Sequence, residues 1–183
     1  MRSLSICLYG GASDNIPQKY VDTVEALGRE MARRGHALIY GGGASGMMGA
    51  AARGVTSQGG FVTGVVPKFL NAFEPIYEDC SAKIKTETMA CRKEVMEENG
   101  DAFIVAPGGI GTFDEFFQVL TLRELGRHDH PIILFNLDGY YDSLVRVIDE
   151  CIGVGFIRGR VRELFDVCDT VDEVLDTIEA KAK

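Results

Sequence analysis

Short, continuous apolar runs alternate along this chain with segments whose apolar residues recur at helical spacing. Runs such as Ala102-Phe-Ile-Val-Ala106 have no polar face, which indicates strands that are covered on both sides. The intervening helical segments would supply that cover. The sequence therefore predicts an α/β fold, one doubly wound parallel sheet with helices on both faces, built as a single domain from residues 1–183.

The boundaries of the expected elements follow from this alternation and from the Gly and Pro residues between them. Strands are expected at residues 3–9, 37–40, 61–66, 83–85, 102–106, 131–135 and 164–168. Helices are expected at residues 17–34, 50–57, 88–99 and 140–154, and from about residues 111 and 170 onward. Residues 67–82, which include Pro67 and Pro75, are expected to form an irregular connection.

Three glycine-rich turns follow expected strands: Gly10-Gly11, Gly41 to Gly49, and Gly108 to Gly111. In a doubly wound sheet the ligand crevice lies beyond the carboxyl ends of the strands. We therefore expect all three turns to line one edge of the sheet. Such convergence indicates a ligand site more strongly than any one turn does.

The third turn lies in Pro107-Gly-Gly-Ile-Gly-Thr-Phe-Asp-Glu115, between a buried strand and a helix. The missing Cβ atoms let a ligand approach the main chain, and the helix N-terminus favours an anion, so this turn suits a phosphate. Asp114 and Glu115 are expected in the first helical turn. Carboxylates beside a phosphate are unfavourable unless they have a chemical task. The alternative is that both only complement the helix dipole.

Composition and charge narrow the functional classes. A net charge of −8 without a basic tract argues against nucleic acid as a partner. No apolar stretch approaches the ~20 residues that span a bilayer, and the first residues lack a signal-peptide pattern, so no membrane partner is expected. The five cysteines are scattered and the three histidines have no metal-ligand spacing. These features predict reduced thiols, a cytoplasmic protein and no metal site.

Gly41, Gly43 and Gly46 match the G-x-G-x-x-G pattern of dinucleotide-binding proteins. That pattern normally follows the first strand, whereas this copy follows the second expected strand. It also requires an acidic residue about 20 positions further on, and residues 54–73 contain no Asp or Glu. The sequence therefore argues against NAD or FAD, while a mononucleotide or a sugar phosphate remains compatible with the turns.

A second motif, Met89-Ala-Cys-Arg-Lys93, lies on the helix that precedes the central strand. By itself this helix would be interpreted as a charged solvent face with ion pairs four residues apart. Paired with Pro107 to Glu115, it resembles the signature of the LONELY GUY (LOG) family of cytokinin riboside 5′-monophosphate phosphoribohydrolases. The resemblance extends along the chain, in Cys7-Leu-Tyr-Gly-Gly-Ala-Ser13, Tyr40 to Gly49, Phe135 to Tyr141 and Gly155-Phe-Ile157.

The resemblance implies a Rossmann-like homodimer without a cofactor, which hydrolyses the N-glycosidic bond of a purine nucleoside 5′-monophosphate to free base and ribose 5-phosphate. It implies Arg92 and Glu115 as the catalytic pair. Gly43 and Ser45 are expected substrate contacts from the second glycine turn. The other expected substrate contacts are Glu74, Met89, Lys93, Gly108, Gly109, Ile110, Gly111, Thr112, Phe113, Asp114 and Thr121.

Two positions depart from the family pattern. The family usually has His after the Met, where this chain has Ala90, and Glu where this chain has Asp114. These changes bear on the preference among bases more than on the reaction. The base itself is left open: AMP, an isopentenyl-type nucleotide or another purine nucleotide fits the motif.

The same residues make chemical sense without the family. Glycoside cleavage passes through an oxocarbenium-like state. A carboxylate such as Glu115 either stabilises this sugar cation or activates the attacking water. Asp114, Gln118 and Thr121 share a helix face and could line the ribose. Arg92 stays protonated, so it is no ordinary general acid. It would hold the phosphate or Glu115, or stabilise charge in the departing base.

Two other functions compete with hydrolysis. A nucleotide or molybdenum-cofactor carrier has similar glycine turns but does not need the pair Arg92 and Glu115. A pyridoxal enzyme, as the label "lysine decarboxylase" would imply, needs a Schiff-base lysine and a partner for the ring nitrogen. Lys93 is the only lysine that lies in a motif.

An apolar group on the base of a cytokinin would need an apolar pocket. Methionines more often fill gaps in a core than bind a ligand, so core positions are the stronger interpretation of the candidates. These candidates are Met47, Met48, Met89 and Phe113.

Overall fold

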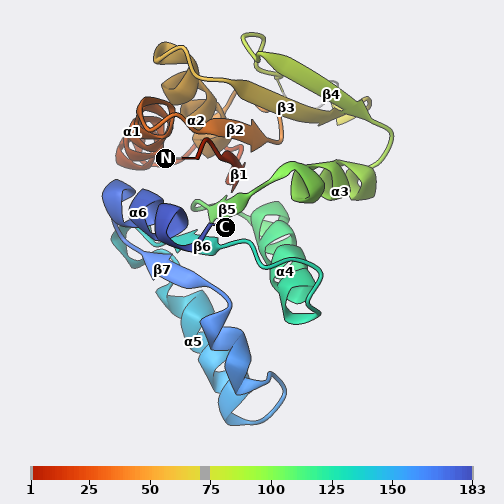
Figure 1. Cartoon of the computed structure of the whole chain (residues 1–183), viewed down its shortest axis with the longest axis vertical. Helices are drawn as coiled ribbons and strands as arrows, with labels where there is room; N and C mark the ends of the chain where they lie inside the picture. The colour runs from red at the N-terminus through yellow and green to blue at the C-terminus, as the bar shows by residue number, and fades with distance from the viewer. Residues whose placement is uncertain (1, 71–74, 183) are drawn as a thin grey trace.

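The computed structural model describes residues 2–70 and 75–182. In this part of the chain seven parallel strands form one sheet, in the order β4-β3-β2-β1-β5-β6-β7 (Figure 1). The strands are β1 (Ser5–Tyr9), β2 (Ala37–Tyr40), β3 (Val62–Pro67), β4 (Ala82–Thr86), β5 (Ala102–Val105), β6 (Ile132–Phe135) and β7 (Asp166–Cys168).

Helices cover both faces of this sheet (Figure 1). The helices are α1 (Gln18–Arg33), α2 (Gly46–Ser57), α3 (Met89–Asn99), α4 (Ile110–Glu124), α5 (Asp142–Gly153) and α6 (Val171–Lys181), with short 3₁₀ turns η2 (Leu137–Gly139) and η3 (Gly159–Glu163). The apolar sides of α1, α2 and α6 form one core with the sheet, and those of α3, α4 and α5 form the other. The predicted doubly wound, Rossmann-like fold is confirmed.

Two expected helices begin at different residues from those predicted. Helix α2 begins at Gly46, inside the glycine stretch, because Gly46 adopts a φ of 58° against the turn after β1. A Cβ at Gly46 would lie 2.4 Å from the carbonyl oxygen of Gly11. Helix α5 begins at Asp142, after the turn η2, in which Asp138 has a φ of 52°. Both starts depend on left-handed backbone that apolar spacing does not reveal.

The turns after β1, β2 and β5 lie together, as expected. The amide of Gly11 donates to the carbonyl of Pro107 at 3.1 Å, and the amide of Met47 donates to the carbonyl of Gly11 at 2.8 Å. Strand β1 leads to β2 on one side and β5 leads to β6 on the other, so the strand order reverses between them. This is the switch point at which open α/β sheets bind ligands.

Helices α1 and α2 approach each other closely because two glycines face the partner backbone. A Cβ at Gly28 would lie 2.3 Å from the carbonyl oxygen of Ala51, and a Cβ at Gly54 would lie 2.2 Å from that of Glu25. Neither distance can be relieved by rotating a side chain, since the neighbouring atoms belong to the main chain. The close contact between α1 and α2 therefore fixes the position of α2, and of the turn before it, relative to the sheet.

We expect Gly28→Ala to lower the free energy of unfolding by about 1–3 kcal/mol, because the added methyl group pushes α1 away from α2. Urea unfolding followed by circular dichroism measures the change. Gly153→Ala is the matched control, since no atom lies within 4 Å of a Cβ added at the last residue of α5. There the change should be neutral or stabilising by up to about 1 kcal/mol. Equal losses in the two variants would contradict this account of the helix pair.

Candidate active site

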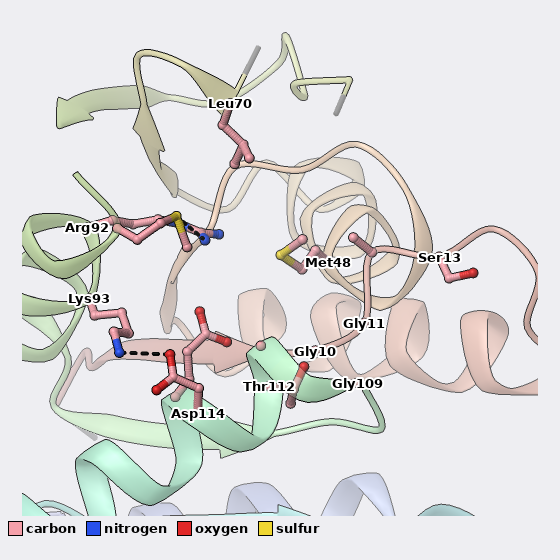
Figure 2. A pocket seen from close by; sticks show the side chains of 14 residues that line it. Gly10, Gly11, Ser13, Met48, Leu70, Arg92, Lys93, Gly109, Thr112 and Asp114 are labelled. Carbon is pink, nitrogen blue, oxygen red and sulfur yellow. Dashed lines mark hydrogen bonds and ion pairs between the residues drawn. The ribbon is translucent and has the colours of Figure 1, made fainter. Parts of the chain in front are cut away.

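A pocket of about 350 Å³ opens at the carboxyl ends of β1 and β5. Its walls come from the turn after β1, from the start of α4 and from α3 (Figure 2). The lining includes eight of the residues expected to form the site: Met89, Arg92, Lys93, Gly109, Gly111, Thr112, Asp114 and Glu115. The other lining residues are Gly10, Gly11, Ala12, Ser13, Met48 and Leu70.

The start of α4 presents main chain to this pocket. Its N-cap residue, Gly109, has no side chain to accept from the first N–H groups of the helix. A Cβ at Gly109 or Gly111 would meet no atom within 4 Å, so the space above both residues is open. An uncapped helix N-terminus with an open approach is suited to bind an anion such as a phosphate.

Gly108 has a different task from its neighbours. A Cβ there would lie 2.1 Å from Oγ1 of Thr112 and 2.7 Å from the amide nitrogen of Gly11. The residue therefore lets the turn after β5 pack against the turn after β1. From the far side, the hydroxyl of Tyr140 donates to the carbonyl of Gly108 at 2.7 Å, and that of Tyr141 donates to the carbonyl of Ala106 at 2.7 Å. These two tyrosines hold the turn from outside the pocket.

The carboxylates of α4 lie one turn later than predicted. Because α4 begins at Ile110, its first turn holds no acidic residue, and Asp114 and Glu115 fall in the second turn. The dipole of a helix acts mainly on charges in its first turn. The alternative in which both carboxylates only complement the dipole therefore loses its structural basis.

Glu115 is buried, with 9% of its surface exposed. Burial raises the pKa of its carboxyl group to about 7; Arg92 opposes that rise and Asp114 adds to it. At neutral pH the group therefore exchanges readily between its protonated and ionised forms. Such a carboxyl group is suited to accept a proton from water and return it.

Arg92 is also buried, with 6% exposed, so the alternative interpretation of this helix as a charged solvent face does not hold at this residue. Its Nε donates to the carbonyl of Val65 at 3.2 Å and its Nη2 to the carbonyl of Gly41 at 3.1 Å. These carbonyls come from within β3 and from the residue after β2. Within residues 2–70 and 75–182, no carboxylate forms an ion pair with Arg92. Its positive charge therefore remains available to the pocket.

Two glycines of the dinucleotide-like pattern, Gly41 and Gly46, make room for neighbouring parts of the fold. A Cβ at Gly41 would lie 1.7 Å from Nη2 of Arg92, so the missing side chain leaves room for the guanidinium. Gly43 pairs with Ile76 in an isolated bridge. Ser45 donates through its hydroxyl to Asp14 at 3.1 Å. Neither Gly43 nor Ser45 lines the pocket, although both were expected to contact substrate.

Lys93 and Asp114 face each other across the pocket rim, with Nζ and Oδ2 2.8 Å apart (Figure 2). Lys93 is therefore engaged by α4 rather than by an acid on its own helix. Asp114 is largely exposed, so this pair contributes little stability. It links α3 to α4 at the mouth of the pocket. One turn further along both helices, Nε2 of Gln118 donates to Oε1 of Glu97 at 2.5 Å.

The other described residues among the expected contacts do not line the pocket. Ile110 is 83% exposed, and Thr121 is exposed on the outer side of α4. Phe113 packs in the core with its ring edge-on to Tyr141, at a centroid distance of 6.4 Å. Glu74 lies outside the described residues. Of the four candidates for an apolar base pocket, Met48 and Met89 line this pocket, Phe113 does not, and Met47 lines a neighbouring one.

Leu70 and the residues from Gly10 to Ser13 were not predicted individually as lining residues. The supporting role of Tyr140 and Tyr141 was not predicted either, although both lie in a stretch that resembles the family. Among the described residues, no group of His, Cys, Asp and Glu side chains could hold a metal ion. The helices described are too short or too polar to cross a membrane.

The raised pKa of Glu115 links stability to pH. A group whose pKa is higher in the folded than in the unfolded protein contributes fully to stability only at pH values below its unfolded pKa, here 4.5. That contribution is lost as the pH rises through the folded pKa, here about 7. Glu115→Gln cannot ionise, so we expect it to exceed the wild type in free energy of unfolding by up to about 3 kcal/mol at pH 8, and by little at pH 4.

Urea unfolding at the two pH values measures this difference. Glu150→Gln, at an exposed position of α5, removes the same charge and should give no pH-dependent gain. A gain at pH 4 as large as that at pH 8 would show that burial of the ionised form is not its cause.

Comparison with known proteins identifies the family. The family model described as possible lysine decarboxylase matches residues 48–178. The probable cytokinin riboside 5′-monophosphate phosphoribohydrolase LOG6 of Arabidopsis thaliana is 38% identical over 178 residues, which cover 97% of this chain and 89% of that protein. The probable enzyme of the same kind LOGL3 of Oryza sativa subsp. japonica is 38% identical over 173 residues, covering 94% and 82%.

Among solved structures, the molybdenum cofactor carrier protein MCP of Chlamydomonas reinhardtii superposes with a TM-score of 0.74 over 98% of both chains. Its identity to this chain is 18%, so the likeness concerns the fold alone. The similarity to the plant proteins is closer and extends over nearly the whole sequence. This chain therefore belongs to the LOG family.

Proposed function

We propose that this protein is an N-glycosyl hydrolase that converts purine nucleoside 5′-monophosphates, of the adenosine or cytokinin type, to free base and ribose 5-phosphate. The observation that carries the proposal is the position of Glu115, a buried carboxyl group in the same pocket as an uncapped helix N-terminus and a buried arginine. The names of the plant relatives support the same reaction.

In this proposal the 5′-phosphate binds to the main chain at Gly109 and Gly111 and to the hydroxyl of Thr112. The ribose then lies over the second turn of α4, next to Glu115. As the bond between C1′ and the base breaks, its electron pair leaves with the base, and the ionised carboxylate stabilises the positive charge of the sugar. Water adds to C1′ and gives a proton to Glu115. The departing base takes one proton from solvent and Glu115 releases its proton to solvent, so the products balance.

Arg92 is assigned to the departing base and to Glu115. The guanidinium lowers the pKa of Glu115, which keeps part of the population ionised despite burial. Its hydrogen bonds go to neutral carbonyl groups, so its charge can offset negative charge that develops on the base. Lys93 and Asp114 would contact the ribose phosphate at the rim. The apolar side chains of Met48, Leu70 and Met89 form the wall that an N6-substituted base would need.

We expect Glu115→Gln to lower the rate of adenine release from AMP by at least about a hundredfold, because it removes the carboxylate from the transition state. Binding of AMP, measured by calorimetry, should persist. Chromatography of AMP incubations gives the rate, and Glu150→Gln is the control that should leave it unchanged. Turnover equal to the wild type would refute the role of Glu115.

The same assay separates hydrolysis from the alternative function, that of a nucleotide or molybdenum-cofactor carrier. Binding of AMP without release of adenine, by the wild type and under all buffer conditions, would favour a carrier. A comparison of AMP with its N6-isopentenyl derivative, by kcat/KM, then identifies the preferred base.

We further propose that the chain acts as a homodimer in the cytoplasm. Helix α4 and its C-cap residue carry an exposed stripe of Ile110, Phe117 and Leu125, with Thr121 between the last two. A second copy seated on this stripe would cover the apolar groups and bring its own Thr121 close to the first site. Free thiols at all five cysteines agree with a reducing compartment.

We expect the wild type to have the mass of a dimer in light scattering at micromolar concentration, and Phe117→Glu to shift it towards the monomer, because the new charge lies in the stripe. Phe61→Glu, which changes an exposed phenylalanine before β3, is the control and should remain dimeric. A dimer that tolerates Phe117→Glu but not Phe61→Glu would place the interface elsewhere.

A further inference from the structure

A carboxylate from another part of the chain caps helix α2, whereas helix α4 is uncapped. Oδ1 of Asp14 accepts from the amide of Gly46, the first residue of α2, at 3.3 Å, and its Oδ2 accepts from the hydroxyl of Ser45 at 3.1 Å. The amide of the next residue, Met47, donates to the carbonyl of Gly11 at 2.8 Å. Asp14 therefore takes the place at α2 that a phosphate takes at a free helix N-terminus.

A second cavity, of about 400 Å³, adjoins the pocket beside Asp14. Gly11, Ser13 and Gly109 line both the pocket and this cavity. Asp14 follows Ser13 in the chain, and its carboxylate is bonded to the residue before Met47, which also lines the second cavity. The described residues that line this cavity include no Lys, Arg or His. An anion that entered it would therefore find no opposite charge on its walls.

The cations near the two cavities are held elsewhere. Figure 2 shows Arg92 and Lys93 at one end of the pocket and Ser13 at the other. Lys19, which precedes a residue that lines the second cavity, pairs with Asp138 of η2 at 2.5 Å. Asp14 itself pairs with no cation within residues 2–70 and 75–182, and it carries an uncompensated carboxylate at the junction of the two cavities.

Gly109 belongs to both cavities, because it precedes the uncapped start of α4. In the proposed reaction the 5′-phosphate binds there and the ribose extends into the pocket towards Glu115. A group attached to the other side of that phosphate must point away from the ribose, towards the second cavity. The additional phosphate of a nucleoside diphosphate would thus bring a negative charge towards Asp14, whereas a monophosphate would not.

We propose that Asp14 is a specificity-determining residue: its carboxylate, fixed at the N-terminus of α2, discriminates against nucleoside di- and triphosphates and so favours 5′-monophosphates. The inference rests on the proposed function, which places the 5′-phosphate at the start of α4. It also explains why the glycine pattern from Gly41 to Gly46 does not bind a pyrophosphate. The amide of Gly46, which would face that group, already donates to Asp14.

We expect the wild type to bind AMP more tightly than ADP, and Asp14→Asn to reduce this preference about fivefold, because it removes the charge but keeps an oxygen that accepts from Gly46. The change should come from tighter binding of ADP. Asp14→Glu keeps the charge and should keep the preference. Asp22→Asn, at an exposed position of α1, is the matched control, since it changes the net charge equally and should leave the preference unchanged. Calorimetry with AMP and ADP gives the dissociation constants.

A purely structural role for Asp14 predicts a different result. Loss of the cap on α2 would weaken the binding of both nucleotides alike, without changing their ratio. Added salt should narrow the preference of the wild type more than that of Asp14→Asn, because only the wild type has the repelling charge.

The test does not require turnover. If the wild type binds AMP without cleaving it, the proposed function fails, whereas the ratio of the two dissociation constants still decides the inference. A ratio that is unchanged in Asp14→Asn, or that moves as far in Asp22→Asn, overturns it. Equal binding of AMP and ADP by the wild type, or binding of neither, overturns it as well.

Discussion

The arrangement of this protein depends on keeping one ionisable carboxyl group out of water. Glu115 is buried beneath an uncapped helix N-terminus, and the burial raises the pKa of the carboxyl group while Arg92 opposes that rise. Neither group would behave in this way on a surface, where solvent screens charges. The packing of α3 and α4 against the sheet therefore supplies the chemistry of the site as much as the two side chains do.

Glycines keep the elements around this carboxyl group close together. Gly41 leaves the space that the guanidinium of Arg92 occupies, and Gly108 lets the turn after β5 contact the turn after β1. Gly28 and Gly54 bring α1 and α2 together, which sets the height of the turn that precedes α2. A side chain at Gly41 would displace the guanidinium of Arg92, and one at Gly28, Gly54 or Gly108 would push main-chain segments apart, so each would change the shape of the pocket.

The sequence was sufficient for the fold, because continuous apolar runs and glycine turns are local signals. The lining residues on α3 were expected only from the resemblance to the LOG family. The burial of Arg92 could not be predicted in this way, since its partners are carbonyl groups of two other segments, one within β3 and one directly after β2. The position of Asp114 and Glu115 in the second helical turn depended on a boundary that shifts by one or two residues. The partnership of Glu97 with Gln118 required the relative placement of two helices, which no local pattern encodes.

The matched spacing of the two links between α3 and α4 has a consequence for how this sequence can change length. Both links join residues 21 positions apart, and only residues 100 and 101 separate α3 from β5. One residue inserted within α3 between Arg92 and Glu97 would rotate the following part of that helix by about 100° relative to the part before it. A deletion would rotate it by the same amount in the opposite sense. The segment from Lys93 to Gln118 should therefore tolerate substitutions far better than insertions or deletions.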